Sequence, residues 1–293
     1  MFSAGLLFLA ACGRDADGDP GLEVVATTTQ AADFARAVGG EKVEVRSLLR
    51  PGGDPHDYEP RPSHVREVAE ANLVVRSGGE VDEWLDELLE EAGGSAQTVT
   101  LLDAAGGRDP HWWQDPRTAD AAVAAIGRGM SKADPGGGEG YSQRAGDYRR
   151  RLRALDRGIA GCMDMVPVSR RKLVTTHDSL RRFADRYGLE VVGTLIPGRS
   201  TEAQPSAGEV DRLASRMKEE EVPAIFPESG VRPKLERALA RESGAEVGDA
   251  LYADTLGRRG SGAETYLRAM ASNTQALVEG MTGGMRSCRP PVR

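Results

Sequence analysis

Leu22-Glu23-Val24-Val25-Ala26-Thr27-Thr28-Thr29 is a short stretch, rich in β-branched residues and bounded by turn formers, which predicts a β-strand. Residues 30–38 follow it directly and have helical spacing. The alternation continues along the first half of the chain, with strands expected at 42–49 and 73–76 and helices at 62–71, 83–92 and 117–131. Strands that alternate with helices predict the α/β class, with a parallel sheet covered on both faces.

The second half of the chain begins a new series of the same kind. Strands are expected at 172–176, 190–196 and 223–227, and helices at 206–220, 232–243 and 262–281 and in the segment that ends at Tyr187. Between the two series, residues 141–165 are highly charged, and their apolar residues recur at helical spacing. We therefore expect two (β/α) lobes with parallel sheets, joined by a single long backbone helix. The expected division is 1–20 for a signal peptide, lipobox and tether, 21–138 for the N-terminal lobe, 139–166 for the connecting helix and 167–293 for the C-terminal lobe.

The composition describes a globular chain without a basic surface. The chain has 293 residues, 39% of them hydrophobic, and a formal net charge of −7 from 45 acidic and 38 basic residues. A protein that binds nucleic acid needs a field of Lys and Arg to hold phosphates. The charge balance therefore argues against nucleic-acid binding and is compatible with a cationic ligand.

The N-terminus carries an apolar run, residues 4–11, that is shorter than the roughly 20 residues needed to cross a bilayer. Its end, Leu9-Ala10-Ala11-Cys12, resembles a bacterial lipobox, in which the cysteine becomes the lipidated first residue of the mature protein. The polar residues 13–20 would then form a tether. We expect an extracytoplasmic protein anchored to the bacterial cell membrane through lipid on Cys12. An ordinary signal peptide is the alternative.

Two further cysteines, Cys162 and Cys288, form one possible disulfide pair. An oxidising compartment outside the cytoplasm would favour joining them. The alternative is two unrelated thiols, since the sequence does not show whether their β-carbons meet.

The histidines are the main indication of function. Three of the four stand in short motifs: His56 in Pro-His-Asp-Tyr-Glu-Pro (55–60), His111 in Asp-Pro-His-Trp-Trp-Gln-Asp-Pro (109–116) and His177 in Thr-Thr-His-Asp (175–178). Together with Asp254 they predict a metal site in the cleft between the lobes, because loops after parallel strands meet at one edge of a sheet. Three imidazoles and one carboxylate suit Zn²⁺ better than Mn²⁺, which prefers oxygen. His64 lacks such a motif, and we expect it at a solvated helix position.

These motifs, together with Ala-Ile-Phe-Pro-Glu-Ser (224–229) and Leu-Tyr-Ala-Asp-Thr-Leu-Gly (251–257), resemble the metal-binding lipoproteins of zinc and manganese ABC transporters. The resemblance covers nearly the whole mature chain. It implies two lobes joined by a rigid helix, metal ligands at His56, His111, His177 and Asp254, and docking onto a permease driven by a cytoplasmic ATPase. Manganese members often carry a carboxylate where His177 stands, which favours zinc here. Unlike many zinc members, the chain has no His-rich loop between the first two ligands.

Several neighbouring residues have two interpretations each. Three aspartates next to the motif histidines would either accept the second ring N–H of a ligand or cap helices and turns; they are Asp57, Asp115 and Asp178. Glu228 would line the cleft or balance an arginine, outside the metal's own ligands. Trp112 and Trp113 would shield the site from water, or one of them would belong to the core. The rigid connecting helix suggests that ligand exchange involves local loop movement around His56, His111 or Asp254.

The function expected from these observations is that of the extracytoplasmic, high-affinity zinc-binding component of an ABC importer, acting as a monomer. A manganese-binding importer component is the first alternative, and an adhesin or metal chaperone that uses the same pocket is another. A zinc-dependent hydrolase, with Glu59 or Glu228 as the general base, is disfavoured because four ligands leave no open position and no His-Glu-x-x-His signature occurs.

The two kinds of histidine predict opposite results on substitution. We expect His111→Ala to lower metal affinity by about 10-fold or more, because it removes a ligand. His64→Ala is expected to leave the affinity nearly unchanged. Calorimetric titration of the metal-stripped variants measures both, and equal losses would contradict the assignment.

Overall fold

The computed structural model describes residues 21–94, 96–230 and 234–292. The lipobox with Cys12, the tether and the first residues of the helix predicted from 232 lie outside this described part. In the first half of the chain, parallel strands form a sheet in the order β2-β1-β3-β4. They are β1 (Leu22–Ala26), β2 (Val43–Ser47), β3 (Leu73–Arg76) and β4 (Gln97–Thr100). The interior strands β1 and β3 are the apolar ones, as expected for strands covered on both faces.

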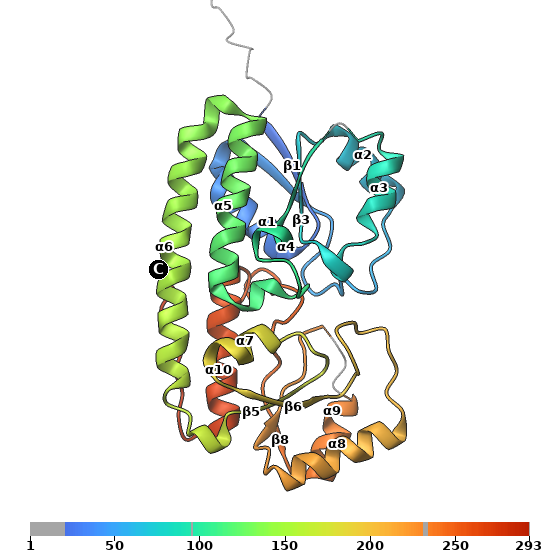
Figure 1. Cartoon of the computed structure of the whole chain (residues 1–293), viewed down its shortest axis with the longest axis vertical. Coiled ribbons are helices and arrows are strands. Elements are labelled where there is room, and N and C mark those ends of the chain that lie inside the picture. Colours follow the sequence, from blue (N-terminus) through green and yellow to red (C-terminus); the bar gives the residue numbers. More distant parts are fainter. Residues whose placement is uncertain (1–20, 95, 231–233, 293) are drawn as a thin grey trace, which may run out of the picture.

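Helices connect these strands and cover the sheet (Figure 1). They are α1 (Thr29–Gly39), α2 (Pro62–Glu70), α3 (Leu85–Glu91), α4 (Leu101–Ala104) and α5 (Pro116–Ala133). The start of α1 is fixed by Thr28, whose hydroxyl accepts the Ala31 N–H, and the start of α5 by Asp115, which accepts the Arg117 N–H. His56 lies in the loop after β2, so this candidate ligand follows the carboxyl end of a strand.

The second half has a smaller set of parallel strands. β5 (Lys172–Thr175) pairs with β6 (Glu190–Thr194), and β7 (Ala224–Ile225) pairs with β8 (Glu246–Val247). A parallel bridge between Thr175 and Phe226 links the two pairs. The helices of this half are α7 (Arg181–Tyr187), α8 (Ala207–Glu219), α9 (Lys234–Ser243) and α10 (Tyr266–Thr282). The α/β class with parallel sheets is thus confirmed.

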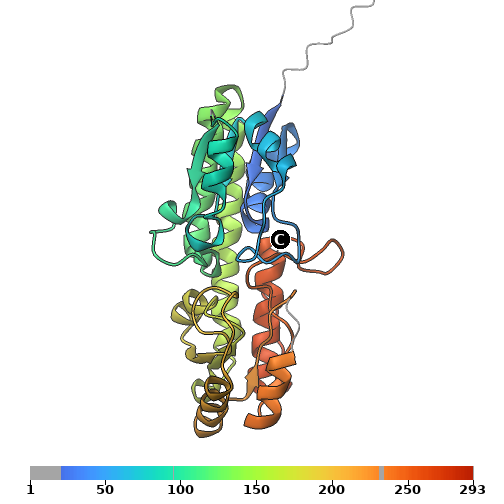
Figure 2. The ribbon, with the colours of Figure 1, turned by 90° about the vertical axis from the view of Figure 1, so that its right-hand side faces the viewer.

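One long helix, α6 (Gly138–Met163), runs beside both halves of the molecule (Figures 1 and 2). Its 26 residues give it a length of about 39 Å. One continuous apolar cluster packs against it: Phe34 and Leu73 of the first half, Leu152 and Ile159 of α6, and Phe226 of the second half all belong to it. The two halves are therefore joined by a shared core as well as by the chain itself.

The C-terminal tail returns to α6 and is joined to it. Cys162 and Cys288 form a disulfide, with their Cα atoms 5.5 Å apart and a sequence separation of 126. Gly158 of α6 allows the C-terminal tail to pack closely against this helix, because a β-carbon at position 158 would lie 3.0 Å from Cβ of Pro290. The predicted pairing of the two cysteines is present in the structure.

Three short elements were not predicted: β4, α4 and β8. β4 is a four-residue edge strand with one apolar side chain, and α4 follows it without a turn, so neither has a periodic pattern long enough to recognise. β8 has two exposed residues. Within the described residues, none of the helices has the length and apolar character needed to span a membrane.

The disulfide should contribute measurably to stability. Replacing both Cys162 and Cys288 by serine is expected to lower the free energy of unfolding by up to about 4 kcal/mol, because the bridge closes a long loop in the unfolded chain. Urea denaturation of the variant and of the parent protein, with and without reductant, measures the difference. Equal midpoints for the oxidised parent and the double variant would contradict it.

Candidate metal centre

The structure brings the four predicted ligands, His56, His111, His177 and Asp254, to one point. The Nε2 atom of His111 lies 3.4 Å from Nε2 of His56 and 3.3 Å from Nε2 of His177. The Asp254 carboxylate faces all three rings: Oδ1 is 3.3 Å from Nε2 of His111, and Oδ2 is 3.4 Å from that of His56 and 3.2 Å from that of His177. All four ligand atoms lie within 4.8 Å of one another.

These separations are those of a coordination shell. Four donor atoms placed tetrahedrally around an ion at about 2.0–2.1 Å, the usual zinc–nitrogen distance, are about 3.3–3.4 Å apart. Because both oxygens of Asp254 face the histidines, the same group offers four donor atoms or five. The residues present therefore fit a divalent transition-metal ion.

The four side chains come from distant parts of the chain. His56 lies in the loop after β2, His177 follows β5, and His111 directly precedes the 3₁₀ turn Trp112–Gln114. Asp254 follows Leu251, which forms a parallel bridge with Glu228. The site thus lies where the two halves of the molecule face each other.

The environment of the four residues is dry and dominated by the charge of Asp254. The side chains of His111 and His177 are fully buried, and those of His56 and Asp254 are 2% and 8% exposed. Burial lowers the pKa of His177, but Asp254 and Glu228 outweigh it and raise this pKa to about 11. Burial likewise opposes the raised pKa of His111, whose main source is Asp254. Burial would raise the pKa of Asp254, yet His177 and His111 hold it well below its usual range.

A family model described as the periplasmic component A of a zinc-uptake complex, ZnuA, matches residues 24–280. The chain belongs to this family. Its members are the substrate-binding proteins of metal ABC transporters, which are solute-binding proteins and not enzymes.

The sequences of individual relatives match nearly the whole chain. The chain is 31% identical to the manganese-binding lipoprotein MntA of Bacillus subtilis, over 93% of this chain and 95% of the relative. It is 29% identical to MntA of Halalkalibacterium halodurans, over 94% and 95%. Among solved structures, the periplasmic zinc-binding protein TroA of Treponema pallidum superposes with a TM-score of 0.83 at 28% identity, covering 88% of this chain and 98% of that one.

As in many metal sites, a carboxylate orients one histidine by bonding to the ring nitrogen that points away from the other ligands. Oε1 of Glu228 accepts the Nδ1–H of His177 at 2.8 Å, so that Nε2 is left to face the other ligand atoms. The same oxygen also accepts the backbone N–H of His177 and the hydroxyl of Ser179. Glu228 was expected to line the cleft or balance an arginine; it does line the small cavity beside the site, and it also supports His177 directly.

The three aspartates singled out beside the motif histidines do not play this part. Asp57 is exposed, Asp115 caps α5 and pairs with Arg117, and Asp178 pairs with Arg181. The carboxylate beside His111 is instead Asp109, which accepts the His111 backbone N–H and lies 3.7 Å from its Nδ1. Asp109 belongs to the 109–116 motif, but its separation from His111 in sequence does not mark it as the aspartate that contacts the ring.

The two tryptophans of the motif have different surroundings. The ring of Trp113 lies edge-on to the His111 ring, with 5.5 Å between centroids, and excludes water from that side. Trp112 packs against Phe34, and its Nε1–H donates to Ser77, so it belongs to the core. Trp113 thus shields the site from water, and Trp112 belongs to the core.

The expectation of a solvated position for His64 is wrong. The residue is 8% exposed, and its Nδ1 accepts the backbone N–H of Arg61 at 3.0 Å, which caps the start of α2. The hydroxyl of Tyr58 lies 3.0 Å from the same nitrogen. Burial lowers the pKa of His64. Its role is in the local helix cap, and it is not a member of the group of possible ligands.

A small cavity of about 50 Å³ lies beside the site, lined in part by Asp54, Thr201, Glu228 and Asp254. One oxygen of Asp54 accepts the His56 N–H and the other accepts the Thr201 hydroxyl at 2.6 Å, so this carboxylate connects the two halves at the cavity. A larger, open cavity of about 400 Å³ near Arg170 and Ser243 shares no residue with the site.

Metal binding should release protons. Because its raised pKa of about 11 leaves His177 protonated in the metal-free protein at neutral pH, an ion has to displace a proton to reach this nitrogen. Affinity is therefore expected to fall as the pH is lowered, by about tenfold per pH unit for each proton displaced. Calorimetry at pH 7 in two buffers of different ionisation enthalpy measures the number released. A value of zero would contradict this charge state.

Proposed function

We propose that this protein is the extracytoplasmic zinc-binding component of an ABC importer and that His56, His111, His177 and Asp254 hold the ion. The convergence of three imidazole nitrogens on one buried carboxylate carries this proposal. A buried carboxylate surrounded by three inward-facing nitrogens is costly unless positive charge balances it, and a metal ion at the centre supplies that charge. Membership in a family of metal-transport proteins supplies the setting.

Zinc is favoured over manganese by the donor atoms. Imidazole suits zinc, whereas manganese is better served by carboxylate, carbonyl and water. For the same ligands, zinc also binds more tightly than manganese in the usual order of divalent metals. Manganese remains the second candidate, because two relatives of similar length are named for manganese and both oxygens of Asp254 are available for a five-donor shell.

The ligand set also suits a cargo that must be given up. It contains no cysteine thiolate, the ligand type of permanent structural zinc sites, and it is divided between the two halves of the molecule. Separation of the halves would break the shell without unfolding either. The partner that receives the ion is, by family membership, a membrane permease with a cytoplasmic ATPase.

The names of the same relatives support a location outside the cytoplasm. Several are named lipoproteins, and the family description is periplasmic. We propose that lipid on Cys12 anchors a monomer outside the cytoplasmic membrane, with residues 13–20 as the tether and the division into lobes at 21–138, 139–166 and 167–293.

Titration of metal-stripped protein is the decisive experiment. We expect one zinc ion per chain and no displacement of bound zinc by excess manganese, because the imidazole-rich shell prefers zinc. The double variant His56→Ala/His177→Ala should lose strong binding, since it removes two of four donors. Strong zinc binding by that variant would refute the site, and manganese that displaces zinc would refute the choice of metal.

The cargo in cells is a separate question from affinity. Deletion of the gene should lower the zinc content of cells grown in zinc-poor medium and leave manganese unchanged, as measured by elemental analysis. A fall in manganese alone would establish the manganese alternative.

A further inference from the structure

The backbone of the segment that carries Asp254 is held by side chains of the first half of the molecule. The carbonyl of Ala253, the residue directly before Asp254, accepts two hydrogen bonds, from Trp113 Nε1–H and from Gln114 Nε2–H, each at 2.8 Å. Both donors are buried, and both follow the ligand His111 in sequence. The candidate ligands His111 and Asp254 are thereby connected through these two hydrogen bonds and a few residues of backbone.

The residues just after Asp254 are held from the same side. The hydroxyl of Thr255 accepts the Gly52 N–H at 2.9 Å, and the Leu256 N–H donates to the hydroxyl of Thr29 at 2.9 Å. Four hydrogen bonds of ordinary length therefore join residues 253–256 to the first half, although this segment belongs to the second half in sequence.

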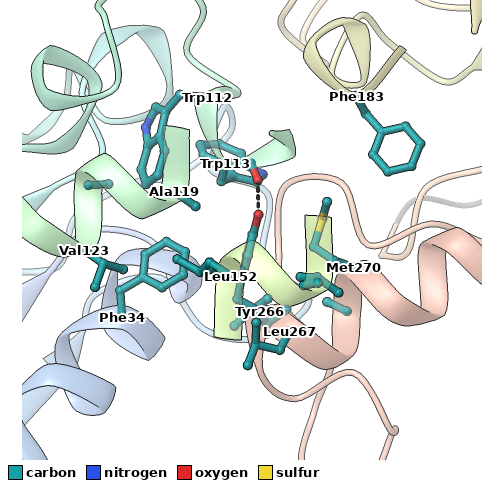
Figure 3. Packing of buried hydrophobic residues seen from close by; sticks show 14 of the residues in the cluster. Phe34, Trp112, Trp113, Ala119, Val123, Leu152, Phe183, Tyr266, Leu267 and Met270 are labelled. Carbon is teal, nitrogen blue, oxygen red and sulfur yellow. Dashed lines mark hydrogen bonds between the residues drawn. The ribbon is translucent and has the colours of Figure 1, made fainter. Parts of the chain in front are cut away.

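The start of α10 continues this attachment. The Tyr266 hydroxyl donates to the Trp113 carbonyl at 2.6 Å, as Figure 3 shows, and the Tyr266 backbone N–H donates to Asp33 of α1. The aromatic ring of Tyr266 packs against Phe34 of the same helix. Trp113 thus contacts the Asp254 segment with its indole and α10 with its carbonyl, and it cannot shift without breaking both bonds.

The partners of the backbone change between residues 252 and 253. Tyr252 exchanges both of its backbone hydrogen bonds with the side chain of Asn273, and Leu251 pairs with the strand segment at Glu228. Leu251 is therefore fixed to the second half, Tyr252 to α10, and residues 253–256 to the first half.

His177 is attached in the opposite way. Its ring and backbone N–H bond to Glu228, and its carbonyl accepts the Thr175 hydroxyl, all within the second half. One hydrogen bond from this part of the second half to the first half is short, from the Thr201 hydroxyl to Asp54 at 2.6 Å. The other two contacts are long: Arg182 Nε lies 3.7 Å from Asp109, and an Arg199 nitrogen lies 3.4 Å from the Arg108 carbonyl. They are weak compared with bonds of 2.8–2.9 Å.

We propose that Trp113 and Gln114 are positioning residues that keep Asp254 together with His56 and His111, so that His177 is the ligand that separates when the site opens. The proposal rests on the proposed metal-carrier function and adds to it the order in which ligands are lost. It differs from the expectation of movement around His56, His111 or Asp254. A movement that withdraws His177 with Glu228 breaks the Thr201–Asp54 hydrogen bond and the two long contacts, and it spares the four short bonds of residues 253–256.

The dissociation rate of zinc tests the positioning role. Gln114→Leu removes one donor to Ala253 at nearly constant volume, and Trp113→Phe removes the other. We expect each change to raise the dissociation rate by about 10-fold and the double variant to raise it by more, as for other groups that orient metal ligands. Gln97→Leu is the matched control, because Gln97 donates to the Gly129 carbonyl in the first sheet region, away from the site.

Stability has to be measured alongside the rate. If Gln114→Leu and Gln97→Leu lower the melting temperature of the metal-free protein alike, but only the first raises the zinc dissociation rate, the positioning role is supported. Unchanged dissociation in both Gln114→Leu and the double variant would overturn it. Absence of zinc binding in the parent protein would instead refute the proposed function, so the two failures are distinguishable.

Distances in the protein with native Trp113 and Gln114 test the order of ligand loss. Spin labels are attached through cysteines introduced at three exposed positions: Ala69 on α2, Asp185 on α7 after His177, and Arg259 after Asp254. On adding zinc, the Ala69–Asp185 distance distribution should shift or narrow, and the Ala69–Arg259 distribution should stay constant. The reverse result, or no change in either pair, would overturn the assignment of His177 as the departing ligand.

Discussion

The structure is arranged around one buried negative charge. Asp254 lies where the two halves meet, and three imidazole nitrogens approach its oxygens at 3.2–3.4 Å. A carboxylate in such a place is stable only if positive charge is supplied, by protons on the rings or by a metal ion. On the proposed function, the same group of atoms has two charge-balanced states, one with protons on the rings and one with a metal ion, and metal binding exchanges the first for the second.

The surrounding fold keeps this convergence accurate. α6 runs beside both halves, and one apolar cluster extends from the first sheet through α6 and α10 to Phe226. A close-packed core of this kind resists large hinge rotation, because opening it would leave voids. Small relative shifts are enough, however, since a metal–ligand bond is lost within about an ångström of displacement. The site thus gains rigidity from the core, and on the proposed function a short movement is enough to release an ion.

The sequence predicted the elements with long periodic patterns and the ligands with distinctive motifs. β1, α5 and α6 were located to within a few residues, and the four candidate ligands come together as expected. The supporting groups were harder to predict, because their partners are set by tertiary contacts. Glu228 lies 51 residues from His177, and no local pattern couples them. Asp115 and Asp178, adjacent to the motifs, have nearer partners in Arg117 and Arg181. His64 forms a cap with an imidazole nitrogen, a role for which Ser, Thr or Asp is the usual signal.

The four converging residues are spread over nearly two hundred positions of the chain, and the carboxylate comes last. A nascent polypeptide that has not yet reached residue 254 carries the three imidazoles without their counter-charge. On the proposed function, loading with metal is therefore coupled to completion of the fold. A copy truncated before residue 254 would lack the one carboxylate of the group.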